Sequence, residues 1–259
     1  MNVEAASAAS LCISIGNTTL KAGVWDGDTW KAVRAEPIGP LAIPALGVWL
    51  NGFARGRAIV GSVVPELTPV LLAQLGESGW TGRALRFPEL PIVPHRLATP
   101  QTTGIDRVCA VRAAWAQVGG ACIVVDGGTA VTVNWVDSSG TFLGGAIIPG
   151  LRLWLESLHT GTAQLPACPC VTDSMPDACG DGTANALKAG AFHGIAGAVE
   201  RLVREARRLL GATTPVLVTG GSGAWLAGVL DAAYHEHLVL DGIRLAGDDF
   251  RLVLFGRDS

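Results

Sequence analysis

The sequence predicts an α/β fold built from two duplicated lobes, and three glycine-bearing strand ends carry that prediction. Residues 11–30 have the pattern of a strand, a polar turn and a second, alternating strand, and residues 124–153 repeat it. A third apolar strand, at residues 215–221, runs into two glycines. Aligning the two hairpins places Gly16 on Gly128, Thr18 on Thr129, Asp26 on Asp137 and Trp30 on Phe142. This repetition indicates a duplicated domain with one phosphate-binding loop in each lobe.

The segments between the hairpins favour parallel strands joined by crossover helices. Residues 57–64 form an apolar strand closed by Pro65, and residues 66–75 have the spacing of an amphipathic helix. We place the boundary between the lobes at residue 118, which gives an N-terminal lobe over 1–118 and a C-terminal lobe over 119–259.

Helical periodicity recurs further along the chain. Helices are expected over residues 105–118, 151–159, 184–210 and 222–233, and proline-rich loops over residues 90–100 and 166–181. The longest helix ends at Gly211 and carries an apolar stripe of Leu187, Ala191, Ile195, Val199, Leu202, Ala206 and Leu209.

Composition excludes several classes of protein. The chain of 259 residues is 49% hydrophobic, which is ample for a buried core, and its formal net charge is −3. The arginines of residues 201–208 indicate a solvated helix face, so no nucleic-acid-binding stripe is expected. No basic leader precedes an apolar segment, and apolar runs are broken before the ~20 residues of a membrane span. A cytoplasmic protein without membrane or nucleic-acid partners is therefore expected.

The cysteines and histidines indicate packing more than metal binding. Cys12, Cys109 and Cys122 lie in apolar settings that suit reduced core thiols. Cys168, Cys170 and Cys179, with His159 upstream, lack paired C-x-x-C spacing, so a loop is favoured over a zinc site. His193 is interpreted as a packing residue, and the His-Glu-His of residues 235–237 as an exposed turn.

Two polar segments have the composition of a chemical site. Asp126, Gly127, Gly128 and Thr129 can bring backbone N–H groups and a carboxylate oxygen to a phosphate. In the other segment a T-T-G loop, with Thr103 as a candidate cap, precedes a helix whose first turn holds Asp106 and Arg107. Asp106 is interpreted either as a residue that complements the helix dipole or as one that faces a substrate.

Seven motifs in order give the chain its family resemblance. They are I-G-N-T-T-L-K, G-S-V-V-P, T-P-Q-T-T-G-I-D-R, D-G-G-T-A-V-T, G-G-A-I-I-P-G-L, A-x-L-P and T-G-G. The three glycine-bearing strand ends resemble those of the actin-like ATPase and sugar-kinase superfamily, with its ribonuclease H-like lobes. The full set, which covers nearly the whole chain, resembles the type III pantothenate kinases.

The resemblance implies an activity: ATP-dependent phosphorylation of pantothenate to 4'-phosphopantothenate, the first step of coenzyme A biosynthesis. It implies ATP, Mg²⁺ and a monovalent cation, K⁺ or NH₄⁺, and a homodimer to which the long helix contributes. Asp106 maps to the general base, and Asp126 to a ligand of the monovalent cation or a neighbour of magnesium. Pantothenate would contact Gly104, Ile105, Asp106, Arg107, Leu97 and Thr183. ATP would contact Ser14, Ile15, Gly16, Asn17, Thr18, Thr19, Leu20, Lys21, Thr129, Gly220 and Gly221.

Two positions depart from the family pattern. The first phosphate loop normally opens with Asp, where this chain has Ser14, and a hydroxyl brings no charge to a metal. Leu97 stands where the family often has a tyrosine. Two alternatives follow: a weak or inactive homologue with a regulatory or binding role, and a related kinase of another small hydroxylated molecule.

Overall fold

The computed structural model describes residues 10–169 and 175–256, and the chain divides into two compact units. The first unit comprises the described residues of Met1–Val93, Ala98–Ala113 and Leu238–Ser259. The second unit comprises those of Pro94–Leu97 and Ala114–His237. Residues 238–256 therefore belong to the same unit as residues 10–93.

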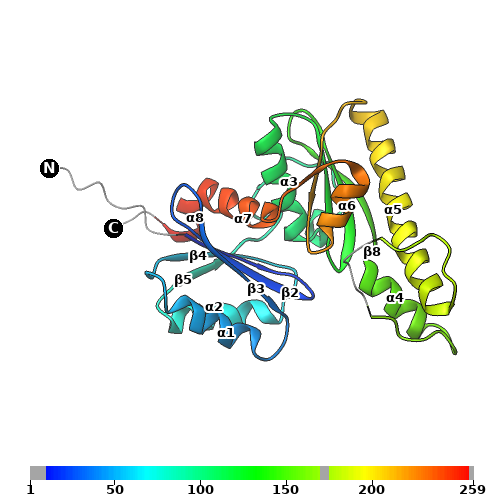
Figure 1. Cartoon of the computed structure of the whole chain (residues 1–259). Coiled ribbons are helices and arrows are strands. Elements are labelled where there is room, and N and C mark those ends of the chain that lie inside the picture. Colours follow the sequence, from blue (N-terminus) through cyan, green and yellow to red (C-terminus); the bar gives the residue numbers. More distant parts are fainter. Residues whose placement is uncertain (1–9, 170–174, 257–259) are drawn as a thin grey trace. The chain divides into compact units, whose positions relative to one another are not determined.

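The first unit holds a five-stranded mixed sheet in the order β3-β2-β1-β4-β5 (Figure 1). Strand β1 pairs antiparallel with β2, and β2 with β3, while β4 and β5 run parallel to β1. The strands are β1 (Ser10–Ile15), β2 (Thr19–Trp25), β3 (Trp30–Pro37), β4 (Arg57–Ser62) and β5 (Thr81–Ala84). The hairpin expected over residues 11–30 is thus confirmed as β1 and β2.

Helices lie against both faces of this sheet. Helices α1 (Ala42–Leu50) and α2 (Leu67–Glu77) lie on one face, and α7 (Leu238–Asp249) lies on the other (Figure 1). On the first of these faces the fully buried side chains include Leu11, Ile13, Ile15, Leu46, Leu50, Leu71 and Leu75. The short η1 (Pro100–Thr102), the start of α3 (Ile105–Val118) and α8 (Arg251–Phe255) complete the unit.

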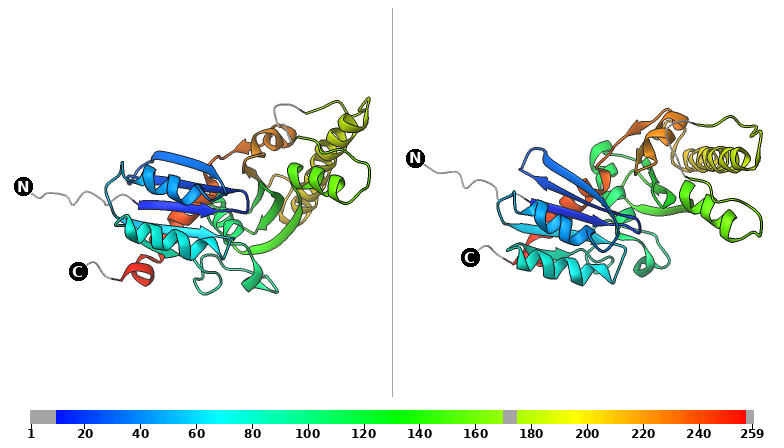
Figure 2. Two further views of the ribbon diagram at one scale, coloured as in Figure 1. Left: turned by 90° about the horizontal axis from the view of Figure 1, so that it is seen from below. Right: turned by 60° about the horizontal axis from the view of Figure 1, so that its bottom comes forward.

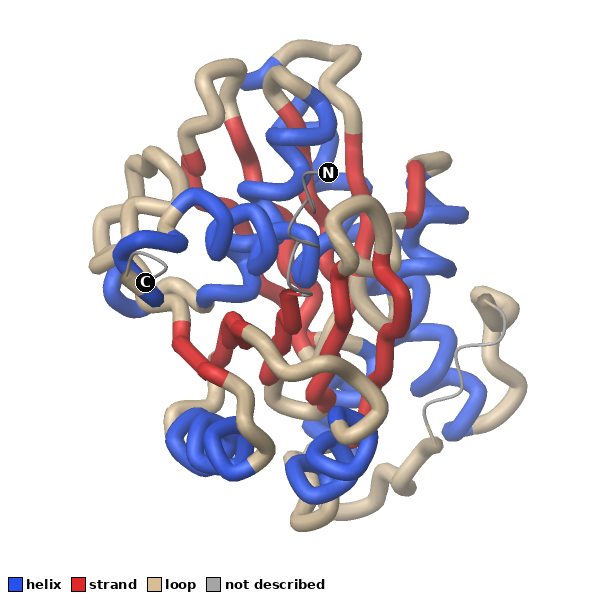
Figure 3. Tube along the Cα trace, turned by 90° about the vertical axis from the view of Figure 1, so that its left-hand side faces the viewer, coloured by secondary structure: helices blue, strands red, loops and turns tan. Residues whose placement is uncertain are grey.

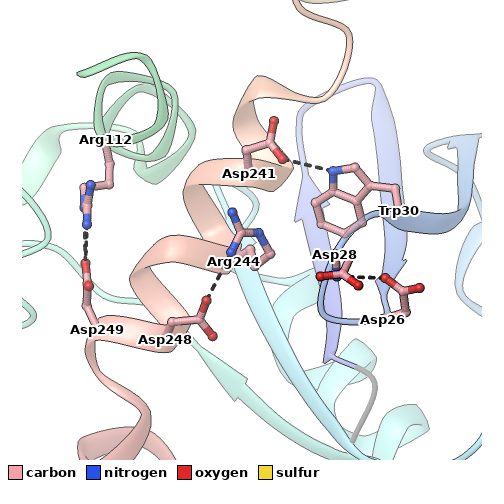
Figure 4. A network of polar contacts seen from close by, with 8 residues as sticks. All are labelled: Asp26, Asp28, Trp30, Arg112, Asp241, Arg244, Asp248 and Asp249. Carbon is pink, nitrogen blue, oxygen red and sulfur yellow. Dashed lines mark hydrogen bonds and ion pairs between the residues drawn. The ribbon is translucent and has the colours of Figure 1, made fainter. Parts of the chain in front are cut away.

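A polar network fixes α7 to the β2–β3 hairpin and to α3 (Figure 4). The indole Nε1 of Trp30 donates to Asp241 Oδ1 at 2.9 Å, and the guanidinium of Arg244 lies 4.4 Å from the ring centre of Trp25. Two nitrogens of Arg112 donate to Asp249 Oδ2 at 2.9 and 3.1 Å. These contacts join segments more than 130 residues apart in the sequence.

The second unit repeats the topology of the first. Its sheet has the order β8-β7-β6-β9-β10, with β6, β7 and β8 antiparallel and with β9 and β10 parallel to β6. The strands are β6 (Cys122–Gly127), β7 (Ala130–Val136), β8 (Phe142–Pro149), β9 (Val216–Thr219) and β10 (Ala233–Tyr234). In each unit helices flank the strands, as Figure 3 shows in red and blue. The predicted pair of duplicated lobes, each a mixed sheet flanked by helices, is confirmed.

The duplication extends to the hairpin turns. Asp26 Oδ1 accepts hydrogen bonds from the backbone N–H groups of Asp28 and Thr29 at 3.0 and 2.8 Å. Asp137 Oδ1 accepts likewise from Ser139 and Thr141 at 2.9 and 3.0 Å. An aspartate that binds its own turn in this way is a common turn device, and its recurrence supports the predicted alignment.

The long helix of the second unit runs along its sheet beside α4 (Figure 2). Helices α4 (Leu151–Thr160), α5 (Thr183–Leu210) and α6 (Gly223–Leu230) all contribute to one core. Most of the predicted stripe of α5 faces this core, because Ala191, Ile195, Val199 and Ala206 are buried there; Leu209 is the exception, 65% exposed. Basic residues of the same helix form ion pairs with acidic residues, as Arg201 does with Glu205.

The helix predicted over residues 222–233 was too long. Helix α6 ends at Leu230, because Asp231 adopts a left-handed backbone conformation with φ of 47° and Ala233–Tyr234 then pairs with β9 as strand β10. None of the helices in the described part of the chain is long and apolar enough to span a membrane.

Candidate active site

The first unit carries a polar turn where β1 ends. Ser14, half-buried, pairs across the sheet with Lys21 on β2 and with Gly61 on β4. Beyond Ile15 the chain turns tightly, and the N–H of Gly16 donates to the carbonyl of Thr19 at 2.9 Å. A Cβ at Gly16 would lie 3.3 Å from that carbonyl oxygen, so a small residue is favoured there. The segment Ser14–Lys21 therefore consists of the end of β1, a tight turn and the start of β2.

Asp106 lies in the first turn of α3, in the same unit. Its Oδ1 accepts a hydrogen bond from the N–H of Arg107 at 2.8 Å. The preceding Gly104 faces this oxygen so closely that a Cβ would collide with it. Burial raises the pKa of Asp106, and the Arg107 N–H and guanidinium oppose this only in part. A carboxylate with a raised pKa binds a proton more readily, which suits a general base.

The second unit carries the D-G-G-T loop where β6 ends. Asp126 pairs with Thr132 on β7 and with Thr219 on β9, so it stands at the centre of the sheet. The N–H of Gly128 donates to the carbonyl of Ala130 at 3.1 Å, which closes the turn before β7. The carbonyl of Thr129 accepts from the N–H of Gly150 at 3.0 Å.

The T-G-G loop that follows β9 packs directly on the D-G-G-T loop. Gly220, with φ of +90°, presents its α-carbon to the Asp126 carboxylate, and a Cβ there would overlap Oδ1. The N–H of Ser222 donates to the carbonyl of Gly127 at 2.8 Å. These contacts bring Asp126 and Gly220, two of the predicted site residues, together from opposite ends of the second unit's sequence.

Tyr234 is a neighbour of this pair of loops that was not predicted. Its hydroxyl donates to the carbonyl of Gly220 at 3.1 Å, and its ring lies against Gly223. Burial raises the pKa of Tyr234, and the charges of Glu236 and Asp126 raise it further. It lies in the two-residue strand β10, which leaves no periodic signal in the sequence.

Two further predicted residues, Thr183 and Leu97, lie in other parts of the second unit. Thr183 is the first residue of α5 and lines an apolar hollow of about 270 Å³ between α4 and α5. Leu97 is half-buried beside Gly144 of β8, and its N–H donates to Nδ1 of His95 at 3.3 Å. Ile105, in the first unit, is buried beside Gly61.

Within the described part of the chain, the candidate metal ligands do not gather into one cluster. Among residues 10–169 and 175–256, no group of three or more His, Cys, Asp or Glu side chains could hold a metal ion. Cys168 and Cys179 are free thiols, while Cys170 lies outside the described residues. His193 contacts the carbonyl of Pro176 at 3.0 Å, which agrees with a packing role. The turn at residues 235–237 is less exposed than predicted, since both of its histidines are half-buried.

Comparisons with known proteins identify the family that the motifs resemble. A family model described as type III pantothenate kinase matches residues 10–205. A type III pantothenate kinase of Synechococcus elongatus is 35% identical, with 91% of this chain and 96% of that protein covered. One from a Parafrankia species is 32% identical with the same coverage.

A solved structure supports the fold. A Campylobacter jejuni protein described as a Baf family transcriptional activator superposes with a TM-score of 0.61 at 23% identity, covering 93% of this chain and 98% of its own. At that identity the likeness concerns the fold alone. The family model and the two curated relatives, each spanning most of the chain, show that this protein belongs to the type III pantothenate kinase family.

Proposed function

We propose that the protein transfers the γ-phosphoryl group of ATP to the 4'-hydroxyl of pantothenate, forming 4'-phosphopantothenate for coenzyme A biosynthesis. Membership of the family supports this reaction. The single structural observation that carries it is Asp106, a partly buried carboxylate of raised pKa at the start of a helix. Phosphoryl transfer depends mainly on positioning and charge neutralisation, and a carboxylate beside the acceptor hydroxyl orients it and accepts its proton.

On the acceptor side, Asp106 would act as the base. Its Oδ1 is already held by the Arg107 N–H, which leaves the rest of the carboxylate to face the hydroxyl. Gly104 lets the chain pass close to this carboxylate, and Arg107 would bind an anionic oxygen of the substrate. Ile105, Leu97 and Thr183 are proposed as further pantothenate contacts, as the family pattern implies.

On the nucleotide side, the loops of both units would bind ATP. In the first unit these residues are Ser14, Ile15, Gly16, Asn17, Thr18, Thr19, Leu20 and Lys21. In the second unit Thr129 would contact a phosphate, and Gly220 and Gly221 would lie against the adenosine. Tight turns at strand ends expose backbone N–H groups, which are suitable donors to phosphate oxygens.

Two cations are part of the proposal. Mg²⁺ usually binds one or two carboxylates together with substrate phosphates, and the carboxylate of Asp126 at the end of β6 suits a place near such an ion. Alternatively, the same carboxylate would hold the monovalent cation, K⁺ or NH₄⁺. When bound, the cations neutralise negative charge on the phosphates. Oxygen donors are the right type for these ions, so the residues present fit them.

A homodimer is also proposed. The apolar hollow of Trp154, Leu158 and Leu187 lies at the surface between α4 and α5, beside Thr183. A partner there would cover apolar side chains that are only partly buried within the second unit. Sedimentation equilibrium of the purified chain tests the assembly.

A coupled assay of ADP release tests the reaction. The purified protein is incubated with ATP, Mg²⁺, K⁺ and pantothenate, and ADP production is followed with and without pantothenate. Production that depends on pantothenate is expected. Turnover no higher than the background without acceptor would refute the proposed function.

A further inference from the structure

A tight turn, Gly220–Gly223, leads from β9 into α6 within the second unit. The N–H of Gly223 donates to the carbonyl of Gly220 at 2.9 Å, and this bond closes the turn. Gly221, inside the turn, is exposed, and a Cβ there would meet no atom within 4 Å. Gly221 therefore marks the part of the turn that a ligand can reach.

The turn rests on the D-G-G-T loop. The N–H of Ser222 donates to the carbonyl of Gly127 at 2.8 Å, and a Cβ at Gly127 would lie 3.0 Å from the Gly223 nitrogen. Gly220 lies against the carboxylate of Asp126. A change in the conformation of the turn would therefore also change the surroundings of Asp126.

Tyr234 restrains the same turn at both of its ends. Its hydroxyl donates to the Gly220 carbonyl at 3.1 Å, so that oxygen accepts two hydrogen bonds and both of its lone pairs are used. Its ring lies against Gly223, where a Cβ would lie 2.6 and 3.0 Å from two ring carbons. Tyr234 thus contacts the first and the last residue of the turn.

The backbone at Tyr234 is itself fixed to the strand that enters the turn. Tyr234 pairs with Val218 of β9, and the N–H of His235 donates to the carbonyl of Val218 at 2.7 Å. The side chain of Tyr234 is 40% exposed, so filling the core does not account for it. Burial raises its pKa, and the charges of Glu236 and Asp126 raise the pKa further, so the hydroxyl remains a donor at neutral pH.

We propose that Tyr234 is a positioning residue for the nucleotide site, and that its hydroxyl holds the turn Gly220–Gly223 in the conformation that accepts the nucleotide. The inference rests on the proposed function, which assigns the T-G-G loop to ATP. A loop that is ordered before the ligand arrives costs less to order on binding. A loop that also adopts other conformations binds more weakly, in proportion to the fraction that is competent.

Two matched variants test the inference. Tyr234→Phe removes the hydroxyl and keeps the ring against Gly223. Thr214→Val is the control, because Thr214 Oγ1 also donates to a glycine carbonyl, that of Gly211 at 2.8 Å, but before β9 and not after it. Each variant therefore loses one hydroxyl-to-carbonyl hydrogen bond in the second unit.

Calorimetric titration with ADP and Mg²⁺, without an acceptor, gives the Kd of the nucleotide. Tyr234→Phe is expected to raise this Kd about two- to tenfold, the factor that one such hydrogen bond contributes, and Thr214→Val should leave it unchanged. In the turnover assay Tyr234→Phe should raise KM for ATP likewise, with KM for pantothenate and kcat unchanged. A general loss of stability would not separate the two KM values in this way.

Hydrogen exchange of the protein without nucleotide separates positioning from direct contact. The amide hydrogens of residues 220–223 should exchange faster in Tyr234→Phe than in wild type or in Thr214→Val, because the turn opens more often. If the Kd for ADP rises while exchange is unchanged, the hydroxyl contacts the nucleotide itself and the positioning role is wrong.

The remaining outcomes distinguish this inference from the function beneath it. An unchanged Kd in Tyr234→Phe, or an equal rise in Thr214→Val, overturns the inference. If wild type binds ADP but does not phosphorylate pantothenate, the proposed function fails, while the Kd values still decide the role of Tyr234. If wild type binds no ADP, the inference is wrong, and the turnover assay decides the proposed function alone.

Discussion

Replacement of Asp106 by Asn tests the proposed general base while keeping the local fold unchanged. Asn has nearly the same shape and keeps an Oδ1 that can accept the Arg107 N–H at 2.8 Å, so the first turn of α3 should be unchanged. What the variant loses is the ability to accept a proton. General base catalysis contributes about 10²- to 10⁴-fold, so kcat should fall by that factor, equivalent to about 3–5 kcal/mol of transition-state stabilisation.

The same variant should be more stable at neutral pH. Burial raises the pKa of Asp106 in the folded state above its unfolded value, so the folded state favours the protonated form. The stability that this protonation gives is complete below the unfolded pKa and is lost as pH rises through the folded pKa. At pH 7 the partly buried charge therefore lowers the free energy of unfolding, and neutral Asn removes that cost.

Three measurements check these expectations. The ADP-release assay gives kcat, chemical denaturation at pH 7 gives the free energy of unfolding, and a pH series gives kcat/KM. Wild type should lose activity as pH falls through the raised pKa of Asp106, at a higher pH than an exposed aspartate would require, and Asp106→Asn should lack that acid limb. A variant with near-wild-type turnover would remove Asp106 from the mechanism, and an unchanged acid limb would assign the titration to another group.

Other predictions concern the loops and the C-terminal helix. Ser14→Asp should lower the Mg²⁺ concentration needed for half-maximal turnover, because it adds a carboxylate to the end of β1; an unchanged Mg²⁺ titration would contradict this. Gly220→Ala should lower the free energy of unfolding by at least about 1–3 kcal/mol because of its positive φ and its contact with the β6 loop. Gly221→Ala, which meets no atom within 4 Å, is the control, and equal losses would refute the argument. Asp241→Ala should cost about 1–3 kcal/mol in urea denaturation by leaving a partly buried indole N–H on β3 without its acceptor; the exposed control Asp28→Ala should cost less, and no difference would count against the role of this bond.

Local patterns alone determined much of this protein. The two hairpins were predictable because alternation and turn residues act over a few positions. Asp26 and Asp137, which the alignment of the hairpins matches, each accept hydrogen bonds within their own turn. Helix α5 was predictable because its stripe, including Ile195 and Val199, matches the core that it meets. Family membership was predictable because it rests on the order of short motifs.

Short or irregular elements were not predictable. Strand β5 has four residues with no alternation of apolar side chains, and β10 has only two. A left-handed residue at Asp231 ends α6 early, and nothing in the periodicity of the preceding residues indicates it. In each case the neighbouring strand, rather than the segment's own pattern, decides the conformation.

Long-range packing decided the rest. Helix α7 lies at the end of the sequence, yet it packs in the first unit, where the α-carbon of Gly242 meets the backbone of Cys109 and Asp241 binds Trp30. The contact of Gly220 with Asp126 likewise joins segments far apart in the chain. Periodicity shows which face of an element is buried but not which element covers it. The sequence therefore predicted the turn after β1 and the D-G-G-T loop after β6, while only the tertiary structure determined their neighbours.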